Sequence, residues 1–234
     1  MIAMLTDDQR KLWEAYETAE GRAPRAEKLQ ALDAFLDALV SSPATDWFPW
    51  ARSVAEQVVD HGTDFVIRRP LFERAVFPAL LAGYQARLPG SARWLAGLAD
   101  HLRRNPQCRE QLPAEEATEL GLLWAAIRQD PADHRSRRRL IDKVSSRLRY
   151  SIHEVPSGIL YGIGGASPEQ CQELEEELEE FSRLVTQAAV QERYAELIRS
   201  CRLHFRGYRD YLLQREKYES YAAYLAQHAE EVGG

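Results

Sequence analysis

The feature that most constrains the fold is the recurrence of helix start signals along the 234 residues. Thr6 and Gln9, and later Ser167 and Gln170, stand three residues apart before runs with apolar periodicity. This is the spacing of a capping box, in which each side chain bonds the backbone N–H of the other residue. Pro168 strengthens the second signal because proline suits the first helical position. Both sites therefore predict the start of a helix.

Apolar residues between such signals recur at helical spacing. Leu29, Leu32, Phe35, Leu36 and Leu39 lie on one face of a helix with 3.6 residues per turn. No stretch of useful length alternates with period two, as a half-buried strand would. The sequence therefore predicts an all-α fold of roughly ten antiparallel helices joined mostly by short loops. An irregular helical array and a short α-solenoid both remain open, because no repeat at a fixed offset is found.

One loop breaks this rhythm, the segment 154–166. It is the one loop long enough to be a domain boundary or a binding loop. We expect an N-terminal helical array over residues 1–153 and a C-terminal helical subdomain over 167–234 packed on it, with a single domain as the alternative. Within the loop a flexible hinge is favoured over an anion site, since Glu169 and Glu173 in the following helix would repel phosphate.

Two neighbouring predicted helices carry opposite charge. Residues 131–149 hold seven basic and two acidic side chains, a net charge of +5, whereas residues 167–180 hold seven glutamates and no base. Like charges one turn apart destabilise a helix by a few tenths of a kcal/mol per pair, and a basic partner would relieve this. The acidic helix is therefore either a solvated face or a docking surface. The docking hypothesis names four of its residues: Glu173, Glu176, Glu177 and Glu180.

Six of the ten tyrosines follow residue 190. Tyr211 and Tyr218 share heptad spacing, and Tyr221 lies one turn further on. Tyrosine offers a large contact area at a small entropic cost, which suits an interface. The same spacing also suits the outer layer of a core. We therefore nominate Tyr211, Tyr218 and Tyr221 as partner-binding residues, with the core as the alternative.

Recognisable catalytic motifs are absent from the sequence. It has no phosphate-binding loop, zinc-protease helix, nucleophile elbow or calcium-binding loop. The three cysteines lack metal-ligand spacing, and we expect them to be reduced and buried. His153 and Glu154 form the one acid–base pair, for which a role at a helix end is favoured over catalysis. The sequence thus predicts a protein that is not an enzyme and needs no cofactor or metal.

The net charge and the hydropathy of the chain limit the classes of partner that it can bind. The net charge of −6 and the acidic block next to the basic one argue against nucleic-acid binding. No apolar run approaches the roughly 20 residues that span a bilayer. The start of the chain lacks the basic and apolar regions of a secretory leader. We therefore expect a cytoplasmic protein whose partner is another protein, with a homodimer left open.

Three stretches resemble a family of helical bacterial proteins. They are residues 71–81 (LFERAVFPALL), 152–161 (IHEVPSGILY) and 201–211 (CRLHFRGYRDY). The family consists of the immunity proteins of toxin–immunity gene pairs, including those of contact-dependent and type VI secretion systems. The resemblance implies an antibacterial toxin inhibitor that binds a cognate toxin with a basic surface, such as a nuclease. From the residues alone, a helical-repeat scaffold or adaptor that binds a peptide or protein is the alternative.

Overall fold

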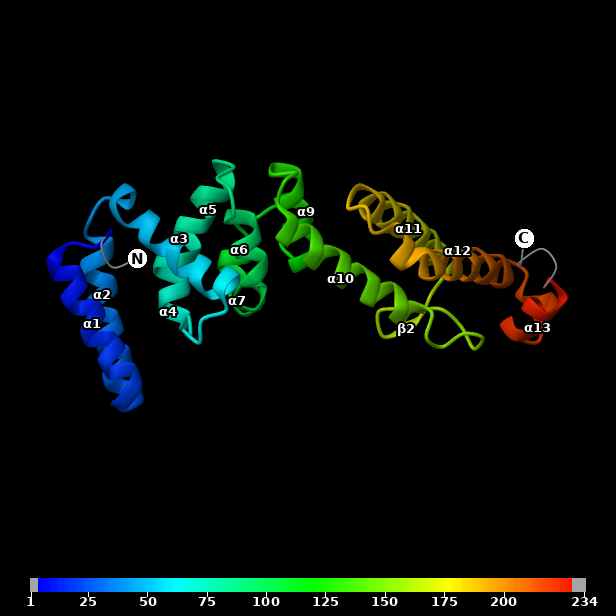
Figure 1. Ribbon diagram of the computed structural model, residues 1–234. Helices are drawn as coiled ribbons and strands as arrows, with labels where there is room; N and C mark the ends of the chain where they lie inside the picture. Colours follow the sequence, from blue (N-terminus) through cyan, green and yellow to red (C-terminus); the bar gives the residue numbers. More distant parts are fainter. Residues whose placement is uncertain (1–3, 229–234) are drawn as a thin grey trace. The chain divides into compact units, whose positions relative to one another are not determined.

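The computed structural model describes residues 4–228, which form two compact units divided between Ser136 and Arg137. Both units are built from helices, so the predicted all-α fold is confirmed (Figure 1). Within residues 4–228, no helix has the length and apolar character needed to cross a bilayer. The first three residues, on which the leader argument partly rests, lie outside the described residues, as do residues 229–234 of the predicted C-terminal subdomain.

The division lies inside a helix, α10 (His134–Ser151), and not at the loop 154–166 where the sequence places it. The loop belongs to the second unit because the chain on its two sides packs together. The backbone N–H of Ala166 donates to the carbonyl of Ile159 at 2.8 Å, which closes the loop. Such closure depends on contacts between distant residues, and a count of glycines and prolines does not reveal them.

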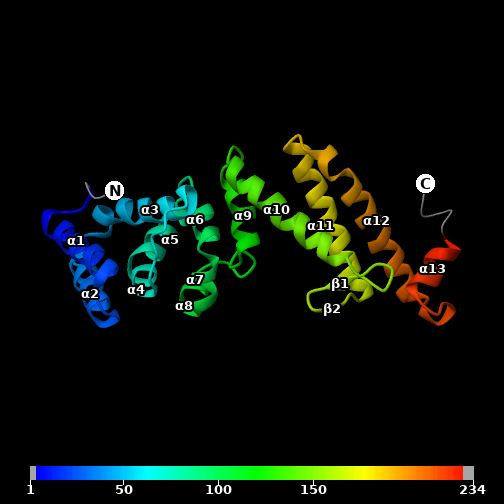
Figure 2. The same cartoon turned by 60° about the horizontal axis from the view of Figure 1, so that its bottom comes forward.

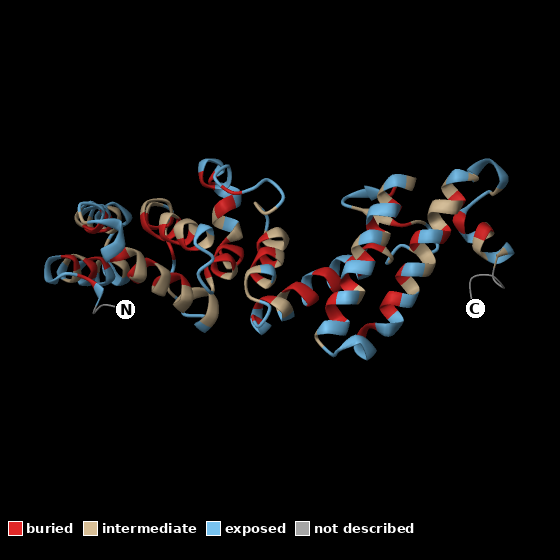
Figure 3. Ribbon diagram, turned by 90° about the horizontal axis from the view of Figure 1, so that it is seen from above, coloured by how far each residue is buried: buried red, intermediate tan, exposed pale blue. Residues whose placement is uncertain are grey.

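The first unit is a succession of helices that bury one face each (Figures 1 and 3). The paired helices α1 and α2 come first. Helices α5 and α6 then pack on α3, and α9 packs on α6. The long elements are α1 (Asp7–Arg22), α2 (Arg25–Val40), α3 (Ala44–His61), α5 (Phe77–Gln85) and α9 (Glu119–Gln129). The short ones are α4 (Arg69–Leu71), the π-helix η2 (Phe72–Val76), α6 (Ser91–Gly97), α7 (Ala99–Arg104) and α8 (Pro106–Arg109).

Aromatic side chains hold α1, α2 and α3 together. The ring centroid of Trp13 lies 5.0 Å from those of Phe35 and Trp50, and 5.3 Å from that of Tyr16. All four side chains are at most 2 % exposed. Tilted and edge-on pairs at these distances add to the free energy gained from burial alone. This cluster therefore stabilises the packing of α1, α2 and α3 against one another.

A buried ion-pair network joins α3, α6 and the start of α10 in the first unit. The guanidinium of Arg93 bonds Asp60 at 2.7 Å and Asp133 at 2.5 Å, and both carboxylates are at most 5 % exposed. The indole N–H of Trp94 donates to Asp60 at 2.8 Å. Asp133 also caps α10 by accepting from the backbone N–H of Ser136 at 3.0 Å. Buried charges of this kind are tolerated only when they are fully paired.

The network predicts that acid lowers the free energy of unfolding of the first unit. Desolvation raises the pKa of Asp60, but hydrogen bonds from Arg93 and Trp94 outweigh it and bring the pKa below its usual value. The pKa of Asp133 is lowered in the same way, because hydrogen bonds from Ser136 and Arg93 exceed the effect of desolvation. A carboxyl with a lowered folded-state pKa contributes stability above its unfolded pKa, about 3.9, and this is lost as the pH falls through the folded value.

We therefore expect the urea midpoint of the first unit to fall as the pH is lowered below about 4. The variant Asp133→Asn is expected to be less stable at pH 7 and to lose less stability on acidification. Urea titrations of both proteins between pH 7 and pH 2 measure this difference. Parallel curves for the two proteins would show that Asp133 does not carry the effect.

Proline and a helix cap shape two places in the first unit. Pro78 has no backbone N–H to donate, and the π-helix η2 lies directly before α5, the helix that contains this proline. The helix α9 begins at Glu119 with Thr118 as its N-cap, whose hydroxyl accepts from the backbone N–H of Gly121 at 3.0 Å. Gly121 permits this start of the helix, because a Cβ there would stand 2.2 Å from the carbonyl oxygen of Glu115.

The second unit contains three long helices, a hairpin and a C-terminal helix. The long helices are α10, of which residues 137–151 belong to this unit, α11 (Pro168–Gln187) and α12 (Gln191–Leu213). Figures 1 and 2 show α11 and α12 side by side as an antiparallel pair. The short elements are β1 (Leu160–Tyr161), β2 (Gly164–Gly165), the 3₁₀ turn η3 (Arg215–Lys217) and α13 (Tyr221–Gln227). The three cysteines of the chain are free and buried, as predicted.

The glycine-rich loop, expected to be a hinge, forms a small antiparallel hairpin. Leu160 pairs with Gly165 and Tyr161 with Gly164, across a turn that begins at Gly162 with a φ of +61°. Glycine is favoured at that position because two-residue hairpin turns require a positive φ there. The Tyr161 hydroxyl donates to Glu173 of α11 at 2.6 Å, so the hairpin is anchored on the acidic helix.

Candidate interaction surface on α11 and α12

The start of α11 and its inward face fix which glutamates point outward. The Ser167 hydroxyl accepts from the backbone N–H of Gln170 at 3.3 Å, and the Gln170 side chain accepts from the N–H of Ser167 at 2.9 Å. This confirms the predicted capping box. A buried face then packs into the second unit, and it consists of Cys171, Leu174, Leu178, Phe181, Leu184 and Val185. The glutamates are consequently confined to the two flanks and the outer side of α11.

Arginines of neighbouring helices neutralise the two flanks of α11. On the flank beside α12, Glu175 pairs with Arg209 at 2.8 Å and Glu179 pairs with Arg202 at 2.7 Å. On the other flank, Glu177 pairs with Arg147 of α10 at 3.3 Å. The acidic helix and its basic neighbours thus compensate each other in part. Three of the seven glutamates are therefore paired with arginines of the second unit.

The other four glutamates form an acidic crest, defined by Glu169, Glu173, Glu176 and Glu180. Their spacings of four, three and four residues place them on one side of the helix. All four residues are exposed. Glu169 accepts from the Ser167 hydroxyl at 2.8 Å, and hydrogen bonding from its own backbone N–H and from Ser167 lowers its pKa. The crest therefore presents acceptors to solvent, and none of the arginines and lysines within residues 4–228 forms a recorded ion pair with them.

Three of the four nominated glutamates lie on this crest, and Glu177 does not. Glu177 is half-buried, and desolvation raises its pKa more than the charge of Arg147 lowers it. A partner could reach its carboxylate only by displacing Arg147. Glu169 takes its place on the crest, and the four-residue spacing from Glu169 to Glu173 is the sequence signal that would have found it.

Two of the three nominated tyrosines belong to a core and not to a surface. Tyr221 is 1 % exposed and Tyr211 is 7 % exposed, and both pack with Tyr224 between α12 and α13. Tyr218 is half-buried at the edge of the same cluster. Burial raises the pKa of Tyr221 far above its usual value. The partner-binding role of Tyr211 and Tyr221 is therefore corrected, because heptad spacing alone does not distinguish a core face from an outer one.

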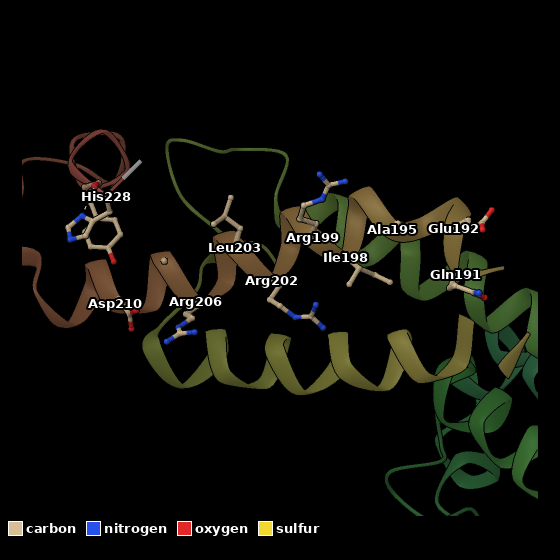
Figure 4. A pocket seen from close by; sticks show the side chains of 12 residues that line it. Gln191, Glu192, Ala195, Ile198, Arg199, Arg202, Leu203, Arg206, Asp210 and His228 are labelled. Atoms are coloured by element: carbon tan, nitrogen blue, oxygen red, sulfur yellow. Dashed lines mark hydrogen bonds between the residues drawn. The ribbon is translucent and has the colours of Figure 1, made fainter. Parts of the chain in front are cut away.

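A groove of about 770 Å³ runs along α12 and was not predicted from the sequence (Figure 4). Arg199, Arg202 and Arg206 line it at helical spacings, together with apolar residues such as Ile198 and with His228 beyond α13. Arg202 and Arg206 extend toward α11, whereas Arg199 points away from it. The spacing of three and then four residues between these arginines indicates in the sequence that they share one side of a helix.

The histidine and carboxylate next to the glycine loop do meet in the structure. His153 Nε2 lies 3.1 Å from Glu154 Oε1, and His153 Nδ1 lies 2.7 Å from the carbonyl oxygen of Tyr150. Both side chains are about half exposed. Across residues 4–228, no group of three or more histidine, cysteine, aspartate or glutamate side chains is placed to hold a metal ion.

Comparison with known proteins adds no relative from which a role could be transferred to these residues. No protein-family model, curated protein or solved structure matches the chain.

Proposed function

We propose that this protein is a non-enzymatic, cytoplasmic binding protein, an immunity protein that neutralises a cognate antibacterial toxin by direct contact. The observation that carries the proposal is the acidic crest of α11. Four exposed carboxylates on one side of a capped helix form a surface that a basic protein would recognise.

The chemistry of the crest favours a folded partner with a cluster of lysines and arginines. A nuclease cleft is such a surface, because it must bind a phosphate backbone. Carboxylates in that cleft would compete with the substrate and block access to it. The flanking ion pairs of Glu175, Glu177 and Glu179 favour this role, since they hold α11 in place and reduce the repulsion within the helix.

The test is co-expression with the product of the neighbouring gene. We expect the two proteins to purify together, and cells that make both to survive when the neighbouring product alone is toxic. Absence of a complex together with absence of protection would contradict the proposal.

A helical scaffold or adaptor is the second candidate, and the groove along α12 is the observation that favours it. Its lining combines apolar residues with Arg199 and Arg206 on the one hand and with Glu192 and Asp210 on the other, a mixture that suits a short peptide carrying both charges. The two proposals predict different ligands, because a scaffold would bind a short peptide alone, whereas an immunity protein would require the folded toxin domain. Binding of isolated peptides from the partner would therefore favour the scaffold.

A further inference from the structure

The first unit contains a second concave surface, distinct from α11 and α12. It is a cleft of about 600 Å³ between α2, α3, the connector 62–68 and the segment from α6 to α8. Its apolar lining consists of Leu29, Val58, Phe65, Val66, Ile67, Pro70 and Leu98. Val66 is 63 % exposed, so this part of the apolar lining faces solvent. The volume lies within the range of small-molecule sites.

The polar lining of this cleft is cationic and contains no carboxylate. Four arginines and one histidine contribute to it: Arg25, Arg68, Arg69, Arg104 and His101. They come from separate parts of the chain, since Arg25 begins α2, Arg104 ends α7 and the other two arginines flank the start of α4. The fold, and not a local run of basic sequence, therefore brings these charges together.

Two of these arginines are already neutralised, and two are available. Arg68 forms an ion pair with Glu20, and Arg69 pairs with Glu73 at 2.7 Å. Arg25 and Arg104 are exposed and have no ion-pair partner among residues 4–228. The cleft thus retains two free cations beside an apolar floor.

His101 adds a polar group to the same lining. Its ring stacks on Phe72 with centroids 4.8 Å apart, and burial, followed by the charge of Arg104, lowers the pKa of its imidazole. Near neutral pH the ring therefore carries one N–H that can donate to an anion.

From this arrangement we infer that the cleft binds a small amphipathic organic anion, whose apolar body lies on Val66, Phe65 and Leu98 and whose acid group is held by Arg25 and Arg104. Charge-assisted hydrogen bonds from guanidinium groups to an acid group are the strong ones in proteins. The apolar floor selects against simple inorganic anions, which gain nothing from it. This inference is independent of the proposed function, because none of its residues lies in the second unit.

Isothermal titration calorimetry of the whole protein with decanoate, below its micelle concentration, tests the inference. We expect saturable binding of decanoate with one site, and at least tenfold weaker binding of acetate, of decanol and of decyltrimethylammonium. Equal binding of decanol would show that the acid group is not recognised. Equal or tighter binding of decyltrimethylammonium would overturn the assigned charge of the site.

Variants locate the site. Arg104→Gln and Arg25→Gln are each expected to weaken decanoate binding by about tenfold, because each removes a charge-assisted contact. Val66→Asp is expected to abolish binding while leaving the fold intact, since the side chain is mostly exposed. Arg103→Gln is the matched control, because Arg103 is the exposed neighbour of Arg104 and does not line the cleft. Equal losses in Arg103→Gln and Arg104→Gln, or no loss in Val66→Asp, would overturn the inference.

Discussion

Replacing Arg93 with leucine is expected to lower the free energy of unfolding of the first unit by about 3–5 kcal/mol. The substitution leaves the carboxylates of Asp60 and Asp133 buried without their cation. Most of this loss of stability arises because the two carboxylates stay buried without water or a cation around them. The lost attraction to Arg93 itself contributes less. Urea unfolding, with hydrogen exchange of the α6 and α9 amides as a local reporter, measures the loss.

Two further variants separate this cause from a general effect of losing an arginine. Arg103→Leu removes an exposed arginine whose pair with Asp100 lies in solvent, and we expect a loss below about 1 kcal/mol. The combination of Arg93→Leu with Asp60→Asn and Asp133→Asn is expected to recover part of the stability, because no unpaired charge then remains buried. A triple variant less stable than Arg93→Leu would contradict this explanation.

Truncation of Trp13 to alanine is expected to cost the first unit about 3–5 kcal/mol. Trp13 is 2 % exposed, and its ring contacts those of Phe35 and Trp50 at 5.0 Å, so the cavity left behind opens between three helices. Thermal unfolding and the protection of α1 and α2 amides against hydrogen exchange measure the effect.

Phe48→Ala is the matched control for the aromatic cluster. Phe48 is only half-buried, and its ring centroid lies 4.7 Å from that of its neighbour Trp47. We expect a loss well below that of Trp13→Ala, because water can fill the space at a surface site. Similar losses in the two variants would show that the cluster around Trp13 is not the main source of stability.

Local signals in the sequence predicted the helices and their starts. The capping boxes at Thr6 and Ser167 use residues three positions apart, and the buried face of α11 follows helical periodicity. These features depend on neighbours along the chain, so a single sequence contains them. The all-α fold and three members of the acidic crest followed from the same information.

Long-range pairing could not be predicted in this way. The partners Arg147 and Glu177 are 30 positions apart, and Arg93 and Asp133 are 40 apart, so nothing local in the sequence indicates that they meet. The unit boundary inside α10 and the burial of Tyr221 depend on the same kind of contact. Composition therefore indicated an acidic helix, but only the fold shows which carboxylates remain open to solvent.

The affinity for the product of the neighbouring gene, measured with and without the charges of the acidic crest, is the most direct test of the proposed function. The test variant replaces Glu169, Glu173, Glu176 and Glu180 with glutamine. The control makes the same change in net charge at four exposed glutamates elsewhere, Glu14, Glu17, Glu27 and Glu110. We predict that the crest variant binds at least about tenfold more weakly and with a smaller dependence on salt, whereas the control binds as the unmodified protein does. Equal affinity of the crest variant and the control would contradict the account.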